Sequence, residues 1–326
     1  MRDPLISGLP PDVEASVVTV GTFDGVHVGH HDLLQRLARR SVATGLPSLL
    51  VTFQPHPLEI VNPSVAPRLL TPGDEKLAAL AECATNYVSV LPFTAELARY
   101  SASAFVEDIL LRRFGMRELL VGYDHGLGRG REGDVESLQA LGSRHGFPVE
   151  VVEAVRVDGT AVSASGIRKA VERGELDEIH RRLGRRYGFQ GRVGRGAQRG
   201  RDLGFPTLNV ELPTARKLLP PEGVYAVLAE TPRGSFGGMM NLGPRPTFGE
   251  TGVTLEVHLF DADGDFYELD VRVQFVAALR ATKRFSGPAE LIAQLAQDAV
   301  DARGALTQVE VPDTLRGSTK HPTPLP

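Results

Sequence analysis

The sequence predicts two domains of different classes: an α/β domain with a parallel sheet, followed by an antiparallel β domain closed by one helix. Its length of 326 residues exceeds the usual size of a single domain. In the first half, apolar strand-like runs alternate with segments of helical periodicity. After about residue 186 glycines become frequent and the apolar segments become short and alternating, which indicates an antiparallel barrel or sandwich.

The composition is that of an ordinary globular protein, with 42% hydrophobic and 23% charged residues. A net charge of −4 gives no indication of a nucleic-acid partner or an acidic membrane surface. The single cysteine, Cys83, excludes an intrachain disulfide and a cysteine-built zinc site. No apolar run reaches membrane-spanning length, and the start lacks the apolar core of a signal peptide. We therefore expect a soluble cytoplasmic protein without nucleic-acid or membrane partners, whose oligomeric state stays open.

Residues 16–53 have the pattern of a strand, a turn, a helix and a second strand. SVVTVG is apolar and β-branched, the following leucines recur at helical spacing, and Gly45 is placed to end the helix. Such a βαβ unit predicts a parallel sheet that binds ligands at the carboxyl ends of its strands. Further helices are expected at 74–85, 101–114 and 135–146, and further strands at 87–93, 118–124 and 148–155.

In the second half, short alternating segments predict strands at 207–212, 223–229 and 237–243. The segments 253–260 and 266–276 flank Asp263-Gly264, which predicts a hairpin turn. An amphipathic helix is expected from 288 to 303, and residues 312–326, rich in proline, are expected to be disordered. We place the domain boundary at the change in composition, giving domains 1–185 and 186–311.

Four of the nine histidines lie within the first 56 residues, near predicted strand ends: His27, His30, His31 and His56. They have three interpretations. They can be surface or helix-capping residues, or they can bind a metal, although no cysteine or obvious carboxylate completes such a site. They can also serve phosphate chemistry, because a helix N-terminus attracts anions and imidazoles donate hydrogen bonds as charge builds on phosphate oxygens.

The glycine-rich stretch 191–210 can be a series of turns, and it is not a Walker A loop, since no G-K-[ST] and no predicted helix follow. It ends in Thr207 and Asn209, whose oxygens face the same side of a strand. Neutral oxygen ligands together with phosphate oxygens suit Mg²⁺. In VTLEVHLF, alternation places Glu256 on the polar face, which is also common for an exposed strand.

The stretch GTFDGVHVGH (21–30) resembles the H-x-G-H motif of the nucleotidylyltransferase superfamily. TFQPHP (52–57), VGYDHGLGRGREGD (121–134) and VSASGIR (163–168) resemble, in order, the remaining blocks of one module of the prokaryotic bifunctional riboflavin kinase/FAD synthetases, the FMN adenylyltransferase module. The resemblance implies a Rossmann-like nucleotidylyltransferase domain.

The same resemblance implies roles for individual residues. His27 and His30 would be catalytic. The ATP and its phosphates would be bound by Gly21, Phe23, Asp24, Gly29, Ser163, Ser165 and Arg168. The flavin would be bound by Pro55, His56 and Asp124. The chain departs from the family pattern at His125 and Leu127, where aromatic residues are usual, and at Ala164 and Gly166.

Four later blocks follow the riboflavin kinase module in order and spacing: 194–209, 223–226, 241–248 and 255–261. They imply a Greek-key barrel in which Glu256 is the general base and Thr207 and Asn209 bind magnesium. ATP would be bound by Gly194, Gly196, Gly200, Gly204 and Thr207, and the flavin by Asn241 and Arg280. Thr282 stands where a Glu is usual, and Tyr267-Glu268 replaces a usual Tyr-Gly.

The resemblance thus implies two reactions that use ATP and Mg²⁺: phosphorylation of riboflavin to FMN, then adenylylation of FMN to FAD with release of pyrophosphate. Positioning and charge neutralisation carry most phosphoryl-transfer catalysis, so no covalent enzyme intermediate is expected. Two alternatives stay open. One is a riboflavin kinase with a degenerate adenylyltransferase domain, and the other is a non-catalytic flavin-binding regulator.

Overall fold

The computed structural model describes residues 9–10, 13–195, 204–244 and 253–307. The expected disordered tail, with Gly196 and Gly200, lies outside these residues. The chain folds as two compact units, Met1–Ile167 and Arg168–Pro326. The division falls within helix α6 (Ala164–Arg173).

The first unit is built on a parallel sheet in the order β3-β2-β1-β4-β5. Its strands are β1 (Ser16–Val20), β2 (Ser48–Gln54), β3 (Tyr87–Pro92), β4 (Met116–Gly122) and β5 (Val149–Val152). Chain order reverses between β1 and β4, the position at which doubly wound sheets bind ligands. The predicted α/β class is confirmed.

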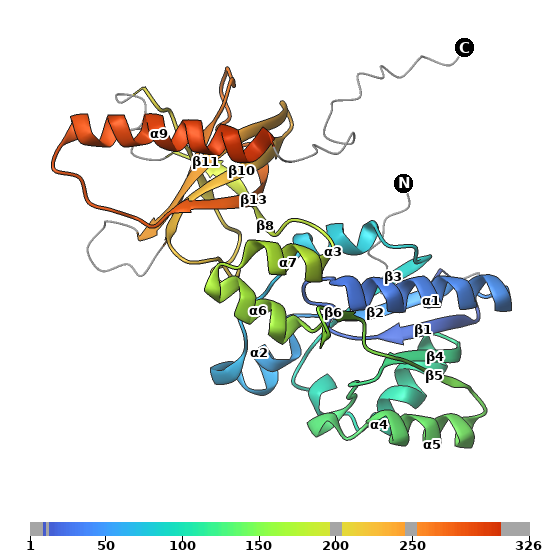
Figure 1. The fold of residues 1–326 in the computed structure, drawn as a ribbon. Helices are drawn as coiled ribbons and strands as arrows, with labels where there is room; N and C mark the ends of the chain where they lie inside the picture. The colour runs from blue at the N-terminus through green and yellow to red at the C-terminus, as the bar shows by residue number, and fades with distance from the viewer. Residues whose placement is uncertain (1–8, 11–12, 196–203, 245–252, 308–326) are drawn as a thin grey trace, which may run out of the picture. The chain divides into compact units, whose positions relative to one another are not determined.

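Helices cover both faces of this sheet (Figure 1). They are α1 (Val28–Thr44), α2 (Pro57–Val61), α3 (Asp74–Ala81), α4 (Ala102–Ala104), the π-helix η3 (Phe105–Arg113) and α5 (Val135–His145), with the short 3₁₀ turns η1 (Pro63–Val65), η2 (Leu97–Arg99) and η4 (Arg129–Arg131). Side chains alternate between the two faces of the sheet, so residues of the same strand contribute to two separate hydrophobic cores. Val17 and Leu50 pack with Leu34 of α1, whereas Val18 and Val51 pack with residues of η3 and α5.

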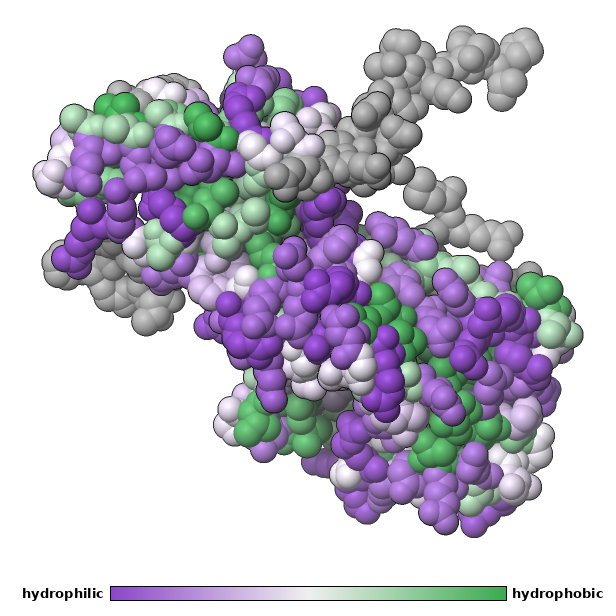
Figure 2. Space-filling model, viewed as in Figure 1, coloured by the Kyte–Doolittle hydropathy of each residue, from purple (hydrophilic) through white to green (hydrophobic). Residues whose placement is uncertain are grey.

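A two-residue turn at Asp158-Gly159 joins β6 (Arg156–Val157) to β7 (Thr160–Ala161). Both turn residues have positive φ, 51° and 75°, as a primed hairpin turn requires. Helix α6 follows and, after it, α7 (Leu176–Leu183), which ends at Gly184 in the left-handed conformation. In Figure 2 the surface over α6 and α7 is strongly hydrophilic.

In its described part, the second unit contains a closed antiparallel barrel in the order β10-β11-β12-β9-β8-β13. The strands are β8 (Gly188–Gly194), β9 (Leu208–Glu211), β10 (Gly223–Thr231), β11 (Gly234–Pro244), β12 (Val253–Leu259) and β13 (Asp270–Arg280). Strand β9 precedes the meander β10-β11-β12, and the last strand of that meander, β12, returns to pair with β9, which is Greek-key topology. Helix α9 (Pro288–Thr307) covers part of the outer face, where Leu295 and Ala302 pack against Met239 of β11.

The hairpin predicted at Asp263-Gly264 is wrong. Strand β12 pairs with β11 and β9, and β13 pairs with β10 and β8, so the two strands that flank this turn are not neighbours. The same dipeptide does form a hairpin at 158–159, because there the flanking strands pair directly. A local turn signal thus predicts that the chain bends. It does not predict which strands pair, because closure of the barrel decides the pairing.

Candidate active sites

The loop Gly21–Val26 connects β1 to α1, and hydrogen bonds to residues 70 and 71 hold it in place. Phe23 and Val26 have positive φ values, 48° and 38°, which non-glycine residues rarely adopt. The buried carboxylate of Asp24 accepts hydrogen bonds from the N–H groups of Leu70 and Thr71 at 2.9–3.1 Å. Asp24 therefore anchors this loop. Its contact with ATP stays a prediction.

His27 and His30 form a reciprocal cap at the start of α1. Each ring accepts, through Nδ1, the backbone N–H of the other residue at 3.3 Å, and the rings stack with centroids 3.7 Å apart. Since Nδ1 accepts, the neutral ring carries its hydrogen on Nε2, which makes Nε2 a donor. The capping interpretation is confirmed for His27, and it is compatible with a role in binding phosphate.

Gly29 lies between the two histidines, and its missing side chain matters. A Cβ at this position would lie 3.2 Å from Cε1 and Nδ1 of the His27 ring. It would also lie 4.0 Å from the carbonyl oxygen of Val162, the residue before Ser163. The H-x-G-H segment therefore lies next to the segment that starts α6.

Ser163 begins α6 as its cap. Its Oγ accepts the N–H of Gly166 at 3.2 Å and shares a hydrogen bond with Ser165 Oγ at 3.1 Å. Two hydroxyls thus stand at the N-terminus of a helix, an environment that favours phosphate. Arg168 follows on the same helix.

His56 caps α2 in the same manner as His27 caps α1. Its Nδ1 accepts the N–H of Leu58 at 3.2 Å, and its own N–H donates to Glu59 Oε1 at 3.1 Å. Pro55 precedes it, after a cis peptide bond. Large apolar side chains are exposed over α2 and η1, visible as green in Figure 2: Leu58, Ile60, Val61 and Val65.

The loop after β4 carries Asp124, whose side chain lies at the surface and whose carbonyl oxygen accepts from Arg131 Nη2 at 2.8 Å. The Nε2 atom of the next residue, His125, is shielded from water and has no hydrogen-bond partner among the described residues. This burial, with the nearby Arg131, lowers the pKa of His125 to about 4. Leu127 belongs to the hydrophobic core. A core position explains why an aliphatic residue is accepted where aromatic residues are usual.

These N-terminal blocks follow the carboxyl ends of three adjacent strands, β2, β1 and β4. The predicted site residues that follow these three strands are therefore gathered at one edge of the sheet, around the reversal of strand order.

In the barrel, the predicted residues fall on one row of strand partners. Asn209 of β9 pairs with Glu256 of β12, and Glu256 pairs with Asn241 of β11. Side chains of directly paired residues lie on the same face of a sheet. Leu255, Val257 and Leu259 are buried in the barrel, so these three polar side chains stand on its outer face.

The row continues beyond Asn209. Gly194 of β8 pairs with Asn209, and a Cβ there would overlap the carboxylate of Glu211. Thr207 immediately precedes β9, and its neighbour Pro206 accepts a hydrogen bond from His258 Nδ1 at 2.8 Å, which fixes that segment against β12. Gly204, with φ of 81°, takes the left-handed conformation.

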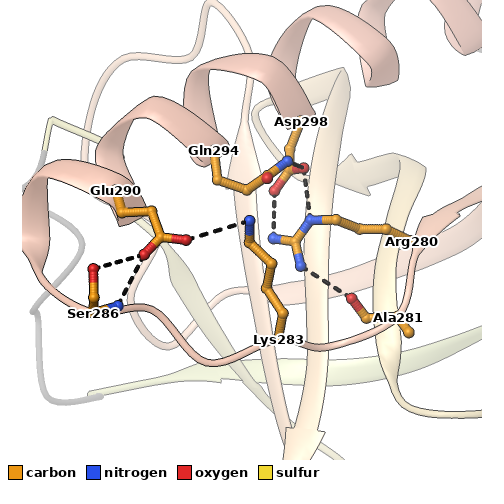
Figure 3. Close-up of polar contacts among 7 residues, drawn as sticks. All are labelled: Arg280, Ala281, Lys283, Ser286, Glu290, Gln294 and Asp298. Carbon is orange, nitrogen blue, oxygen red and sulfur yellow. Dashed lines mark hydrogen bonds and ion pairs between the residues drawn. The ribbon is translucent and has the colours of Figure 1, made fainter.

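Arg280 ends β13 and binds helix α9 (Figure 3). Its Nε and Nη2 donate to the two carboxylate oxygens of Asp298 at 2.8 and 2.7 Å, and Gln294 also donates to Asp298. The guanidinium thus forms an ion pair with α9. Flavin binding by Arg280 stays a prediction.

Two departures from the family pattern lie near the barrel. Glu268, which stands where glycine is usual, has φ of 61°, in the left-handed region that favours glycine. Thr282 lies after β13, between Arg280 and Lys283.

Some buried residues were not singled out from the sequence. Lys76 and Asp298 are charged, yet both are buried. The burial of both residues could have been inferred from their positions on amphipathic helices. Lys76 stands three and four residues before Ala79 and Leu80 on the buried side of α3, and Asp298 stands four residues before Ala302 on the buried side of α9.

No helix in the described ranges is long and apolar enough to cross a membrane. The H-x-G-H loop at the edge of the parallel sheet and the polar strand face on the Greek-key barrel are two separate candidate sites, the arrangement expected of a transferase with two centres.

Comparison with known proteins identifies both domains. A family model described as FAD synthetase matches residues 9–166, and one described as riboflavin kinase matches residues 183–306. The chain is 38% identical to the bifunctional riboflavin kinase/FMN adenylyltransferase of Escherichia coli strain K12, over 89% of this chain and 92% of that protein. It is 38% identical to the enzyme of the same name from Pseudomonas fluorescens, over 91% of this chain and 95% of that protein.

A crystal structure titled macrolide-efflux protein from Streptococcus pneumoniae is also similar, with a TM-score of 0.81, 25% identity, and coverage of 92% of this chain and 98% of that one. We take from it the likeness of fold alone. The chain belongs to the family of bifunctional riboflavin kinase/FMN adenylyltransferases. It carries both the FAD synthetase and the riboflavin kinase domain of that family.

Proposed function

We propose that the barrel transfers the γ-phosphoryl group of ATP to the ribityl 5′-hydroxyl of riboflavin, and that the α/β domain joins AMP from a second ATP to the resulting FMN. The observation that carries this division is that the two family models match separate stretches, 9–166 and 183–306. The relatives bear the name of both activities over the length of the chain.

For adenylyl transfer, we assign His27 and His30 to the reacting phosphate. Their Nε2–H groups are suited to donate to phosphate oxygens as negative charge builds there, and the N-terminus of α1 favours the same charge. Ser163, Ser165 and Arg168, at the start of α6, would bind the other phosphates of ATP.

For flavin binding in this domain, we assign Pro55, His56 and Asp124, which follow the ends of β2 and β4. The exposed apolar side chains of α2 and η1 begin two residues after His56. An isoalloxazine ring is largely apolar, so this surface is suited to cover part of it.

For riboflavin phosphorylation, we assign Glu256 as the general base, which would accept the proton of the attacking hydroxyl. The residues present fit a magnesium ion, because Asn209 and Glu256 bring side-chain oxygens together on paired strands and Thr207 lies two residues before Asn209. Bound there by Thr207 and Asn209, Mg²⁺ would neutralise phosphate charge. Asn241, exposed beside Glu256, would contact the flavin.

We also propose that the catalytic units are residues 1–185 and 186–311, since each set of motifs lies on one side of that boundary. A cytoplasmic location is proposed because both steps consume ATP.

The purified protein should convert riboflavin, in the presence of ATP and Mg²⁺, to FMN and then to FAD, with ADP and pyrophosphate as the other products. Chromatography of the flavins over time measures both steps. FMN that accumulates without FAD would indicate a kinase with a degenerate α/β domain. Tight flavin binding without consumption of ATP would indicate a regulator.

A further inference from the structure

Helix α3 carries a buried lysine, Lys76, that has not been assigned a role in either proposed centre. Lys76 is only 7% exposed, whereas lysines are almost never buried unless their charge is compensated. It stands on the same side of α3 as the buried residues Ala79 and Leu80.

The ammonium group of Lys76 joins the carboxyl ends of two strands. Its Nζ donates to the carbonyl oxygen of Phe53 at 2.8 Å, to Thr52 Oγ1 at 3.3 Å and to the carbonyl oxygen of Thr22 at 3.5 Å. Thr52 Oγ1 also donates to the carbonyl oxygen of Thr22 at 3.1 Å. The three donors of the ammonium thus match three acceptors, two from the end of β2 and one from the loop that follows β1.

The segments that Lys76 joins both lead into the adenylyltransferase centre. Thr22 opens the loop that delivers His27, and Phe53 precedes Pro55 and His56. The loop holds two non-glycine residues with positive φ, a conformation that persists only where the surroundings determine it. Asp24 fixes the loop through Leu70 and Thr71, and Gly25 N–H adds a bond to Thr71 Oγ1 at 2.8 Å.

We propose that Lys76 is a positioning residue for adenylyl transfer, whose buried ammonium fixes the Gly21–Val26 loop against the 52–57 segment so that His27 and His30 meet the reacting phosphate in register. It does not need to touch either substrate.

A purely structural role would be poorly served by a buried charge. Burial lowers the pKa of Lys76 to about 8, with only partial compensation from the charge of Asp24, so the environment disfavours the charged form. Lys76→Met would remove this disfavoured charge but would leave the acceptors of Phe53, Thr52 and Thr22 without their donor, so its two effects on stability oppose each other. The proposal therefore predicts that activity and stability separate when the charge is removed.

The test compares the full-length Lys76→Met and Lys76→Gln variants with the wild-type chain. FAD formation from added FMN, ATP and Mg²⁺ should fall roughly 10- to 100-fold in kcat, the scale of effect of a misplacement of about 1 Å. FMN formation from riboflavin should be unchanged, and the melting temperature should change little, because the removed charge and the lost hydrogen bonds have opposite effects on stability. Lys217→Met supplies a matched control, because Lys217 is also buried but lies over the Tyr187 ring in the second unit, and FAD formation from FMN should persist.

A second readout is the pH profile of FAD formation. The strand ends and residues 70–73 contribute no titratable side chain, the charge of Asp24 acts on Lys76, and Asp74 and Glu75 precede it in the first turn of its own helix. The wild-type rate should fall above pH 8 as the ammonium loses its proton, and Lys76→Arg, which stays charged, should extend activity to higher pH.

Full FAD synthesis by Lys76→Met and Lys76→Gln would overturn the proposal. So would a loss of FAD synthesis accompanied by an equal loss of kinase activity and a lower melting temperature, since that would show general damage to the fold.

Discussion

At His27 and His30, the ring nitrogen Nδ1 caps helix α1, and Nε2 is the nitrogen to which we assign the contact with phosphate. Both Nδ1 atoms accept backbone N–H groups in the reciprocal cap, so a substitution by alanine removes a cap and a donor together. Loss of an N-cap alone costs about 1 kcal/mol. Informative variants must therefore keep the cap.

We predict that His27→Asn and His30→Gln lower FAD formation from FMN roughly 100- to 1000-fold, the usual effect of losing one donor to the transition state. Asn is a favourable N-cap and Gln at the third helical position completes a capping box, so the melting temperature should be nearly unchanged. FMN formation from riboflavin should persist. Equal losses of both activities in a folded variant would contradict two separate centres.

Glu256 is fixed between Asn209 and Asn241 on paired strands. Glu256→Gln keeps the size of the side chain but removes the basic oxygen, and we expect FMN production to fall roughly 100- to 10,000-fold, towards the low end if the transition state is loose. Riboflavin affinity should change little, and adenylylation of added FMN should continue. Full kinase activity in this variant would remove Glu256 from the mechanism.

The lowered pKa of His125 predicts how the stability of the fold depends on pH. Its pKa is about 4 in the folded chain and near 6.5 when exposed, so between these values the unfolded chain binds more protons. Stability should therefore be lost as pH falls from 6.5 to 4, by up to about 3 kcal/mol. Melting curves at pH 7 and pH 4.5 measure this, and His125→Phe should show a smaller loss over the same interval. An identical loss in both proteins would mean that His125 is not the buried base described above.

At the scale of elements, helix α9 is held by two bidentate Arg–Asp pairs that differ in burial. Arg280–Asp298 is shielded, with Asp298 only 1% exposed, whereas Arg303–Asp261 lies at the surface, with the Asp261 side chain 78% exposed. The contrast gives an internal control, because Arg280–Asp298 joins α9 to the end of β13 (Figure 3) and Arg303–Asp261 joins it to the turn after β12.

We expect Asp298→Asn to destabilise the barrel by about 3 kcal/mol, since it leaves a guanidinium that is largely buried without its counter-charge. Asp261→Asn should leave the unfolding midpoint unchanged, because exposed ion pairs contribute little. Urea unfolding monitored by kinase activity and circular dichroism compares the two. Equal effects would show that burial is not what distinguishes the pairs.

The sequence predicted the elements well where a single period governs them. The leucines of α1, the left-handed end at Gly45 and the alternation in β12 all follow from local geometry, and the structure has them. It could not predict the partners of β13, which depend on closure of the barrel, nor the burial of Lys76 and Asp298, whose compensation comes from distant segments. The π-helical turns of η3 also carry no local signal.

At the scale of the whole molecule, the two activities should separate. A fragment of residues 186–311 should phosphorylate riboflavin and form no FAD. A second fragment that begins at Arg168, the first residue of the second compact unit, would interrupt α6 and separate Ser163 and Ser165 from Arg168. Product chromatography with each purified fragment tests the boundary. A folded 186–311 fragment without kinase activity, beside an active 168–311 fragment, would move the boundary into α6.

The barrel closes by pairing its first strand, β8, with its last, β13. A chain that grows from its N-terminus can complete the parallel sheet once Val152 has left the ribosome, but it cannot close the barrel before residues 270–280 have been made. The growing chain thus acquires a foldable FAD-forming domain first and the FMN-forming barrel last, the reverse of the order in which a flavin passes through them. A ribosome that stalls before Asp270 would leave a chain able to consume FMN but not to produce it.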